Sequence, residues 1–422
     1  MSRFLLMLTL VFAGEIIFGL PFHTARFFRP TLLEAFGFSN TQLGDVFAVY
    51  GITAMIAYFP GGALADRYPA RSLLTVSLLL TGLGGFYMAT FPGAMGMAFL
   101  YGYWGVTTIL LFWAALIRAT REWGGKTSQG RAFGILDGGR GLAGALFATL
   151  GVAVLAWRMP DSAGMISDEE RRAAFRSVIL LYSFAAMGAA AMTWALLPAS
   201  SKSVDTGLAV FRHSMQVLMR PLVWGQAAVI ICAYCAFKGL DNYALYAVQV
   251  LDMSEVDGAG LSTIGGYIRP VAAVAAGFLA DRWTATKTIG SSFAVLLVSY
   301  SLLSVALPKG TGLALIYANL FVSFFAVFAL RGVYFALLEE NGTPPYLTGA
   351  VTGTVSFVGY TPEIFFSPIT GRILDANPGV VGHQNYFLFL AGVMLFGLIV
   401  VAWLLRLQQK PVDTQWPQRT TD

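Results

Sequence analysis

Two arginines lie deep inside long apolar stretches of the chain. Arg140 follows the start of its stretch by about ten residues, and Arg269 precedes Asp281, at the end of another stretch, by twelve. With a helical rise of about 1.5 Å per residue, each side chain lies about 15 to 18 Å from the nearer helix end. A guanidinium offers a planar fork of donors that fits carboxylate, phosphate, sulfonate or nitrate. The two arginines therefore predict an anion site, unless each pairs with its own carboxylate, as Arg140 would with Asp137.

Two carboxylates also lie in apolar stretches. Glu15 stands in the middle of "VFAGEIIFG", and Glu363 in "GYTPEIFF" follows a proline, a residue that can open a helix. A carboxyl group in apolar surroundings holds its proton more readily than one in water, which suits a proton carrier. We expect Glu15 or Glu363 to couple proton movement, and we group Asp137 with them. The alternative is that each is a permanent counter-ion to a nearby arginine.

The composition places these charges in a membrane protein. Of the 422 residues, 57% are hydrophobic and only 12% are Asp, Glu, Lys or Arg. Soluble domains carry roughly 25% charged residues, and no soluble fold of this size has an interior that hides so much apolar surface. The net charge of +5 fits basic residues gathered in short cytoplasmic loops better than a nucleic-acid site.

Twelve apolar stretches are long enough to cross a bilayer, which takes roughly 20 helical residues. The positive-inside rule places both termini in the cytoplasm, because most basic loops then lie inside. The outward loop from Arg158 to Arg176 is an exception, since it is heavily charged with mixed signs. The predicted spans are residues 4–26, 42–64, 72–92, 94–117, 131–157, 174–198, 222–250, 258–280, 287–307, 311–338, 347–374 and 384–407.

A short motif occurs twice. "GALADR" at Gly62–Arg67 returns as "GFLADR" at Gly277–Arg282, a shift of 215 residues (277 minus 62), and "QGRAFG" at Gln129 is matched more weakly by "TGAVTG" at Thr348. Such repetition is typical of transporters built from two similar bundles around a central site. We expect bundles over residues 1–198 and 221–408, a cytoplasmic linker over 199–220 and a cytoplasmic tail over 409–422.

The same shift aligns polar residues of the seventh predicted span with those of the first. In "FKGLDNYALY", Lys238 matches His23 and Asp241 matches Arg26. We expect these positions to form an outer gate between the two spans; the alternative is an ordinary salt bridge of Lys238 with Asp241, three residues apart. The residues that we assign to the substrate site are Arg140, Arg269, Asn242, Tyr246, Lys238 and Asp241.

The stretch "GGALADRYPAR", which contains the first copy of the motif, resembles the signature between the second and third helices of major facilitator superfamily transporters. The likeness in architecture covers essentially the whole chain, although Pro69 replaces a usual glycine and "YGYWG" replaces a common helix-4 motif. The resemblance implies an all-α polytopic membrane protein with twelve transmembrane helices in two pseudo-symmetric six-helix bundles, working by alternating access. It also implies a conformational latch at the membrane boundary, made of Asp66, Arg67, Arg71, Asp281 and Arg282.

Other stretches, such as "QGRAFGILDGGRG", are similar to bacterial nitrate and organic-anion porters. Nitrate porters carry an arginine in helix 2, where this chain has Ala54 at the position that matches Arg269. We therefore expect a monomer in the bacterial inner membrane that moves a small organic anion, with protons as the coupling ion. The alternatives are an exporter of drugs or amphipathic lipids, a nitrate or nitrite porter, and a membrane receptor that binds without transport.

The sequence lacks the residue patterns that several other functions require. The sequence has no phosphate-binding loop for ATP, no Gly-x-Ser-x-Gly elbow, and no metal-spaced cluster among His23, His213 and His383. Cys232 and Cys235 lie on one apolar stretch and are expected to pack as small hydrophobic side chains. We therefore expect no enzyme activity, no cofactor, no metal and no nucleic-acid partner.

Overall fold

The computed structural model describes residues 3–125, 128–159, 166–199, 220–305, 312–343 and 347–409, and every regular element in these ranges is a helix. Nearly all of the predicted linker and tail, with His213, lies outside the described residues. The chain forms two compact units. Unit 1 comprises Met1–Asp205, Asp241–Tyr267 and Glu363–Gly379, and unit 2 comprises Thr206–Leu240, Ile268–Pro362 and Val380–Asp422.

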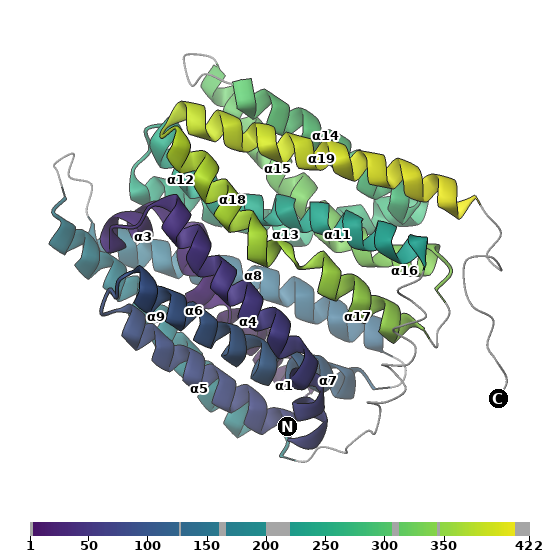
Figure 1. Ribbon diagram of the computed structural model, residues 1–422. Coiled ribbons are helices and arrows are strands. Elements are labelled where there is room, and N and C mark those ends of the chain that lie inside the picture. The colour runs from purple at the N-terminus through teal and green to yellow at the C-terminus, as the bar shows by residue number, and fades with distance from the viewer. Residues whose placement is uncertain are drawn as a thin grey trace. The chain divides into compact units, whose positions relative to one another are not determined.

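Figure 1 labels most of the helices of each unit. Those of unit 1 are α1 (Arg3–Ile16), α2 (Thr24–Phe27), α3 (Arg29–Phe36), α4 (Asn40–Arg67), α5 (Ala70–Met88), α6 (Ala94–Gly105), α7 (Ala114–Gly124), α8 (Gln129–Arg158), α9 (Asp168–Leu196), α12 (Tyr243–Val250) and nearly all of α18 (Pro362–Ala376). Those of unit 2 are α11 (Pro221–Gly239), α14 (Ala285–Val305), α15 (Gly312–Val333), α16 (Leu337–Glu340), α17 (Thr348–Gly359) and α19 (Val380–Gln408). The long helix α13 (Glu255–Arg282) is divided between the units after Tyr267.

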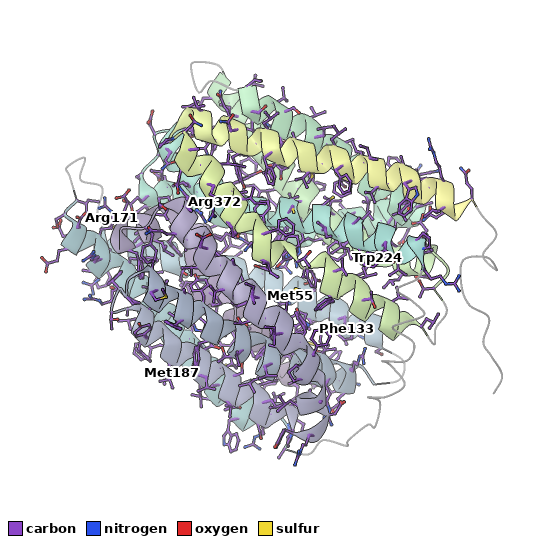
Figure 2. All side chains as sticks on the ribbon, in the orientation of Figure 1. Met55, Phe133, Arg171, Met187, Trp224 and Arg372 are labelled. Carbon is purple, nitrogen blue, oxygen red and sulfur yellow. The ribbon has the colours of Figure 1, made fainter. Side chains whose placement is uncertain are left out.

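The described helices have the length and polarity of membrane spans. Ten stretches qualify, and α1 together with the bent segment Gly19–Phe27 makes an eleventh. The remaining predicted span, residues 347–374, is present as α17 and α18, which are interrupted at Tyr360 and Thr361. Most of the side-chain atoms along the helices in Figure 2 are carbon. The side chains of Phe4, Phe99 and Trp157 are each more than 70% exposed. Large apolar groups exposed in this way suit contact with lipid.

The repeat predicted from one hexapeptide extends over whole helices. α4 and α13 are both 28 residues long, and they end at Arg67 and Arg282, the arginines of the two copies. α5 and α14 then begin at Ala70 and Ala285, which preserves the shift of 215 residues. The two halves of the chain therefore share their helix boundaries in this region, as the motif predicted.

Within unit 1, α18 packs against the first half of α4 with almost no side chain between the two backbones. A Cβ atom added to Gly44 would lie 2.4 Å from the backbone oxygen of Ser367. One added to Gly371 would lie 2.4 Å from the backbone oxygen of Asn40. Helices approach this closely only where both surfaces carry small residues, so the contact depends on these glycines.

The end of α18 also caps the start of α4. Asp375 accepts hydrogen bonds from the backbone N–H groups of Asn40 (3.1 Å) and Thr41 (2.7 Å), where the helix dipole favours a negative charge. The Asn40 side chain also donates to Asp375 and accepts from the buried Arg29. Partial burial alone would raise the pKa of Asp375, which lies past the predicted apolar span, but hydrogen bonds from Thr41 and Asn40 outweigh burial and lower it.

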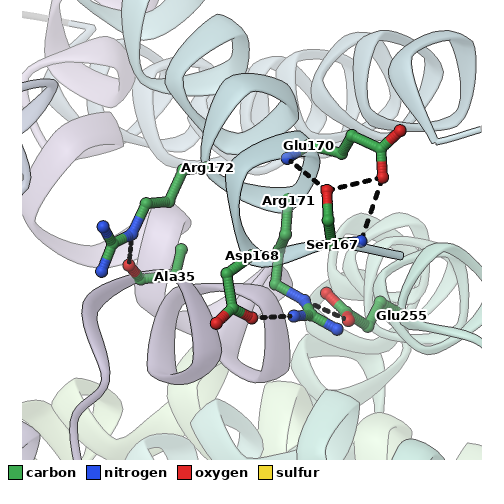
Figure 3. A network of polar contacts seen from close by, with 7 residues as sticks. All are labelled: Ala35, Ser167, Asp168, Glu170, Arg171, Arg172 and Glu255. Carbon is green, nitrogen blue, oxygen red and sulfur yellow. Dashed lines mark hydrogen bonds and ion pairs between the residues drawn. The ribbon is translucent and has the colours of Figure 1, made fainter. Parts of the chain in front are cut away.

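Arginines in the first turns of α9, a segment that the sequence predicts to lie outside, contact other helices (Figure 3). Arg172 donates to the carbonyl oxygen of Ala35 in the last turn of α3 (2.8 Å), where a positive charge opposes the negative end of the helix dipole. Arg171 lies between two carboxylates, those of Asp168 (3.2 Å) and of Glu255 at the start of α13 (2.9 Å). Arg171 and Arg172 therefore have structural partners in unit 1.

We expect Gly371→Ala to lower the melting temperature of the detergent-solubilised protein. The added methyl group overpacks the contact with Asn40, at a cost of about 1 to 3 kcal/mol. Gly188→Ala in α9 is the matched control, because nothing lies within 4 Å of a Cβ atom at this helical position and alanine favours a helix by about 1 kcal/mol over glycine. Equal melting temperatures for the two variants would contradict the close contact of α4 with α18.

Candidate functional site

Glu15, His23 and Arg140 meet in the interior of unit 1. Nε of Arg140 lies 3.2 Å from Oε2 of Glu15, and the second carboxylate oxygen, Oε1, lies 3.2 Å from Nε2 of His23. Glu15 is 7% exposed and His23 is 5% exposed. The N–H of Nε of Arg140 donates to the carbonyl oxygen of Gly14 (2.9 Å), so its contact with Oε2 of Glu15 is an attraction between charges. The cluster thus holds a guanidinium, a carboxylate and an imidazole side by side in an apolar helix bundle.

A break in the first span brings His23 back to Glu15. α1 ends at Ile16, and a π-helical turn over Gly19–His23 follows, with a bend of 42° between the two segments. In a continuous α-helix, residues eight apart lie about 12 Å apart along the axis and about 80° apart around it. The wider turn, which contains Pro21, shifts the imidazole relative to that regular position, and such turns are frequent at functional sites.

Two glycines leave the room that the ion pair fills between α1 and α8. A Cβ atom added to Gly144 on α8 would lie 2.6 Å from Oε1 of Glu15, and one added to Gly14 on α1 would lie 3.2 Å from Cδ of Arg140. Either methyl group would have to displace a side chain of the pair. The glycine-rich stretch around Arg140 therefore serves close helix packing and the fit of Glu15.

Aromatic rings lie against the guanidinium of Arg140. Its Cζ atom is 5.6 Å from the ring centre of Phe18 and 5.7 Å from that of Trp113. The two rings stand edge to face, with centres 6.2 Å apart. Ring faces attract a cation that has lost part of its hydration, so they hold Arg140 in place beside Glu15.

A second ion pair in unit 1 joins the first and seventh predicted spans. Nε of Arg26 lies 2.5 Å from Oδ1 of Asp241, and the two side chains are 15% and 6% exposed. The residues are 215 positions apart, which equals the shift of the repeat. Residues at matching positions of the two halves therefore bind each other, a pairing that the alignment did not specify, and their function as an outer gate stays a prediction.

The other residues predicted for the substrate site are divided between the units. Asn242 and Tyr246 are buried in unit 1, before and within α12. Lys238 is buried at the end of α11, and Arg269 is half-buried in α13, both in unit 2. Joint binding of one anion by Arg269 and Arg140 therefore stays a prediction.

The two remaining candidate proton carriers are Glu363 and Asp137. Glu363 is half-buried in the first turn of α18, where its backbone packs on Gly51 of α4. Asp137 is exposed on α8, one turn before Arg140. The carboxylate that pairs with Arg140 is that of Glu15 on another helix, rather than that of Asp137.

The residues predicted to form a latch lie at helix ends. Asp66 is half-buried and Arg67 is exposed at the end of α4, while Asp281 and Arg282 are exposed at the end of α13. The guanidinium of Arg71 stacks on the ring of Trp194, 4.0 Å from its centre. A residue outside the predicted set, Arg118 of α7, donates to the carbonyl oxygens of Ala65 and Asp66 and so caps the end of α4.

Sequence reasoning placed His23 only at the outer gate and did not join it to Glu15. The signal for the break was present in "FGLPFH", where a glycine and a proline follow one another closely in an apolar stretch. Within the described ranges, no group of three or more His, Cys, Asp or Glu side chains has the geometry to hold a metal ion.

We expect Asp241→Ala to lower the melting temperature strongly, because breaking a buried ion pair costs about 3 to 5 kcal/mol. The control is Asp45→Ala, which removes a pair with Arg372 whose side chains are 51% and 57% exposed and which is worth at most about 1 kcal/mol. The exchanged pair Arg26→Asp with Asp241→Arg should recover part of the loss. Similar shifts for Asp241→Ala and Asp45→Ala would contradict this assignment.

Comparison with known proteins gives the chain relatives over nearly its full length. The inner membrane protein YqcE of Escherichia coli is 25% identical over 96% of this chain and 95% of its own. The hexuronate transporter of Bacillus subtilis is 23% identical over 92% of this chain and 91% of its own. The probable nitrate/nitrite antiporter NarK1 of Thermus thermophilus is 23% identical over 95% of this chain and 90% of its own. A crystal structure of a variant of the nucleoside transporter NupG shares the fold, with a TM-score of 0.75 at 12% identity over 97% of this chain and 100% of that one.

The family model of the Major Facilitator Superfamily matches residues 11–367. The match covers most of both predicted bundles, and the shared fold agrees with it. The chain is therefore a multi-pass membrane protein that belongs to the major facilitator superfamily of transporters.

Proposed function

We propose that this transporter moves a small organic anion across the bacterial inner membrane by alternating access, with a proton as the coupling ion. The observation that carries the proposal is the buried ion pair of Arg140 with Glu15. A guanidinium at this depth is a cost to the fold unless it has a partner or lines a path. In this site its partner is itself a titratable group.

Binding of an anion at Arg140 competes with Glu15. The ion pair and the hydrogen bond to Gly14 are both made by Nε, so the outer edge of the guanidinium, formed by its two Nη groups, is the edge that would receive a substrate carboxylate. Two carboxylates on one guanidinium repel each other. Protonation of Glu15 removes this repulsion and frees Arg140 for the substrate.

This competition sets the stoichiometry. With Glu15 ionised and no substrate, the pair has no net charge. With Glu15 protonated and an anion of charge minus one on Arg140, the net charge is again zero. A state without net charge is favoured over a charged state in a medium of low dielectric constant. The proton and the anion therefore travel together, as a one-to-one symport.

Relatives support the anion class. The hexuronate transporter is named for a carboxylate, and NarK1 is named for nitrate and nitrite. The rings of Phe18 and Trp113 beside Arg140 suit the carbon skeleton of an organic anion better than a bare inorganic ion. We assign Arg269, Asn242, Tyr246, Lys238 and Asp241 to the remainder of the site.

The rest of the proposal concerns topology and gating. Both termini lie in the cytoplasm, the protein acts as a monomer, and residues 199–220 link bundles over 1–198 and 221–408. Arg26 with Asp241 closes the outer gate. Asp66, Arg67, Arg71, Asp281 and Arg282 form the cytoplasmic latch, and the cargo crosses without chemical change.

We expect Arg140→Gln to abolish saturable uptake in proteoliposomes of at least one anion among glucuronate, 3-phenylpropionate, glycerol 3-phosphate, methanesulfonate and nitrate. The amide has no charge and cannot form the paired hydrogen bonds of a guanidinium. Arg158→Gln, at the exposed end of the same helix, is the control and should transport like the wild type. Unchanged saturable uptake in Arg140→Gln would overturn the binding role, and a wild type that moves amphipathic drugs but none of the five anions would favour the exporter.

We expect Glu15→Gln to exchange labelled for unlabelled substrate across the membrane but to lose accumulation driven by a pH gradient. Glutamine fills the place of a protonated glutamate and cannot release a proton. Glu363→Gln is the comparison, because Glu363 does not pair with Arg140. Accumulation that persists in Glu15→Gln and fails in Glu363→Gln would move the coupling role to Glu363.

A further inference from the structure

The two nitrogens of the His23 imidazole have different surroundings. Nε2 lies 3.2 Å from Oε1 of Glu15, whereas Nδ1 is buried and has no hydrogen-bond partner among the residues that the structure describes. The rings of Phe27 and Tyr182 stand edge to face against the imidazole, with centres 5.4 Å and 5.8 Å away. Packing therefore fixes the ring with Nε2 toward the carboxylate.

An ionised Glu15 only accepts hydrogen bonds, so Nε2 of the imidazole carries a proton when the two groups are in contact. The neutral ring with its proton on Nε2 donates to the carboxylate and leaves a lone pair on Nδ1. A doubly protonated ring would carry a second N–H on Nδ1 without an acceptor and would bring another positive charge toward Arg140. Burying an unpaired polar atom costs free energy, so the lone pair on Nδ1 is a feature that stability alone does not explain.

His23 also lies on the outer side of Glu15 along the first span. It is eight residues further along the chain than Glu15, and Arg26, whose pair with Asp241 is the proposed outer gate, follows one turn later. With the N-terminus in the cytoplasm, as proposed above, a proton entering from outside passes the level of His23 before it reaches Glu15.

We propose that His23 relays the proton between the outer side and Glu15. This inference rests on the proposed function, in which Glu15 is the coupling carboxylate. His23 does not touch the substrate anion; it acts through Glu15 and is a positioning and relay residue.

The relay conserves atoms and charge. A hydronium ion from the outer side gives a proton to Nδ1 of His23 and becomes water, and the proton on Nε2 moves to Oε1 of Glu15. The ring is then neutral, with its proton on Nδ1, and Nε2 accepts a hydrogen bond from the new carboxyl group. Glu15 releases its proton toward the inner side. The ring resets when Nδ1 gives its proton to water and Nε2 takes one from a hydronium ion, an exchange without net transfer.

Charged and titratable groups face the ring or its carboxylate partner from several helices. α8 contributes Arg140, which pairs with Glu15. α9 contributes Tyr182, a buried phenol whose ring packs on the imidazole. Arg26 and Asp241 form a pair without net charge one turn further out.

The test separates net proton transfer from substrate movement. Proteoliposomes receive the wild type, His23→Gln or His23→Asn, and the probe is whichever of glucuronate, 3-phenylpropionate, glycerol 3-phosphate and methanesulfonate the wild type exchanges fastest. Accumulation driven by an inward proton gradient and exchange at equal pH are both measured, with thermal melting to identify the folded variant. His383→Gln is the control, since His383 is another buried histidine, in unit 2.

Loss of the relay should slow accumulation in the folded His23 variant by about tenfold or more, in the range of proton-transfer effects in proteins, while exchange stays near the wild-type rate. His383→Gln should keep both accumulation and exchange near the wild-type rates. A folded His23 variant that accumulates like the wild type overturns the relay and leaves the proposed function standing. A folded His23 variant that loses exchange and accumulation in parallel also overturns the relay, because a parallel loss indicates a structural role for His23. A wild type that exchanges none of the four probes overturns the proposed function together with the relay.

Discussion

The ion pair of Arg140 with Glu15 is the contact on which the site depends. A guanidinium and a carboxylate at this depth are both unfavourable alone, so each keeps the other charged, and removing one leaves a buried charge without compensation. The fold makes room for the pair with Gly14 and Gly144. In the proposed mechanism, helix packing and transport depend on the same ion pair, because binding of a substrate anion at Arg140 requires a neutral Glu15.

Ion pairs and a charged helix cap also hold helices together at the end of unit 1 that is predicted to face outward. Arg26 binds Asp241, Arg171 binds Glu255, and Asp375 caps α4. Each contact joins a helix of the N-terminal half to a segment from the C-terminal half of the chain. Residues 26 and 241 are 215 positions apart, which equals the shift of the repeat.

Much of the fold could be predicted from the sequence, since apolar length and a repeated hexapeptide are local properties. The shared ends of α4 and α13 followed from the repeat, whereas the pair of Arg26 with Asp241 was not predicted. The sequence offered Glu15 as a counter-ion to a nearby arginine without saying which one, and it named Asp137 as the partner of Arg140, because Asp137 is near in sequence and Glu15 is near only in space. The link of His23 to Glu15 depends on a π-helical turn, and neither periodicity nor propensity specifies where such a turn adds its extra residue. The interruption of α17 and α18 was indicated by Pro362, whereas the glycine contact of α18 with α4 needed the three-dimensional structure.

Proton linkage of anion binding tests the central claim most directly. Titration calorimetry of the purified protein with the best probe anion, repeated in buffers of different ionisation enthalpy, counts the protons taken up on binding. If the anion displaces an ionised Glu15 from Arg140, the wild type takes up about one proton per anion bound at neutral pH, and Glu15→Gln binds the anion without proton uptake. Binding by the wild type with no proton uptake would contradict the account.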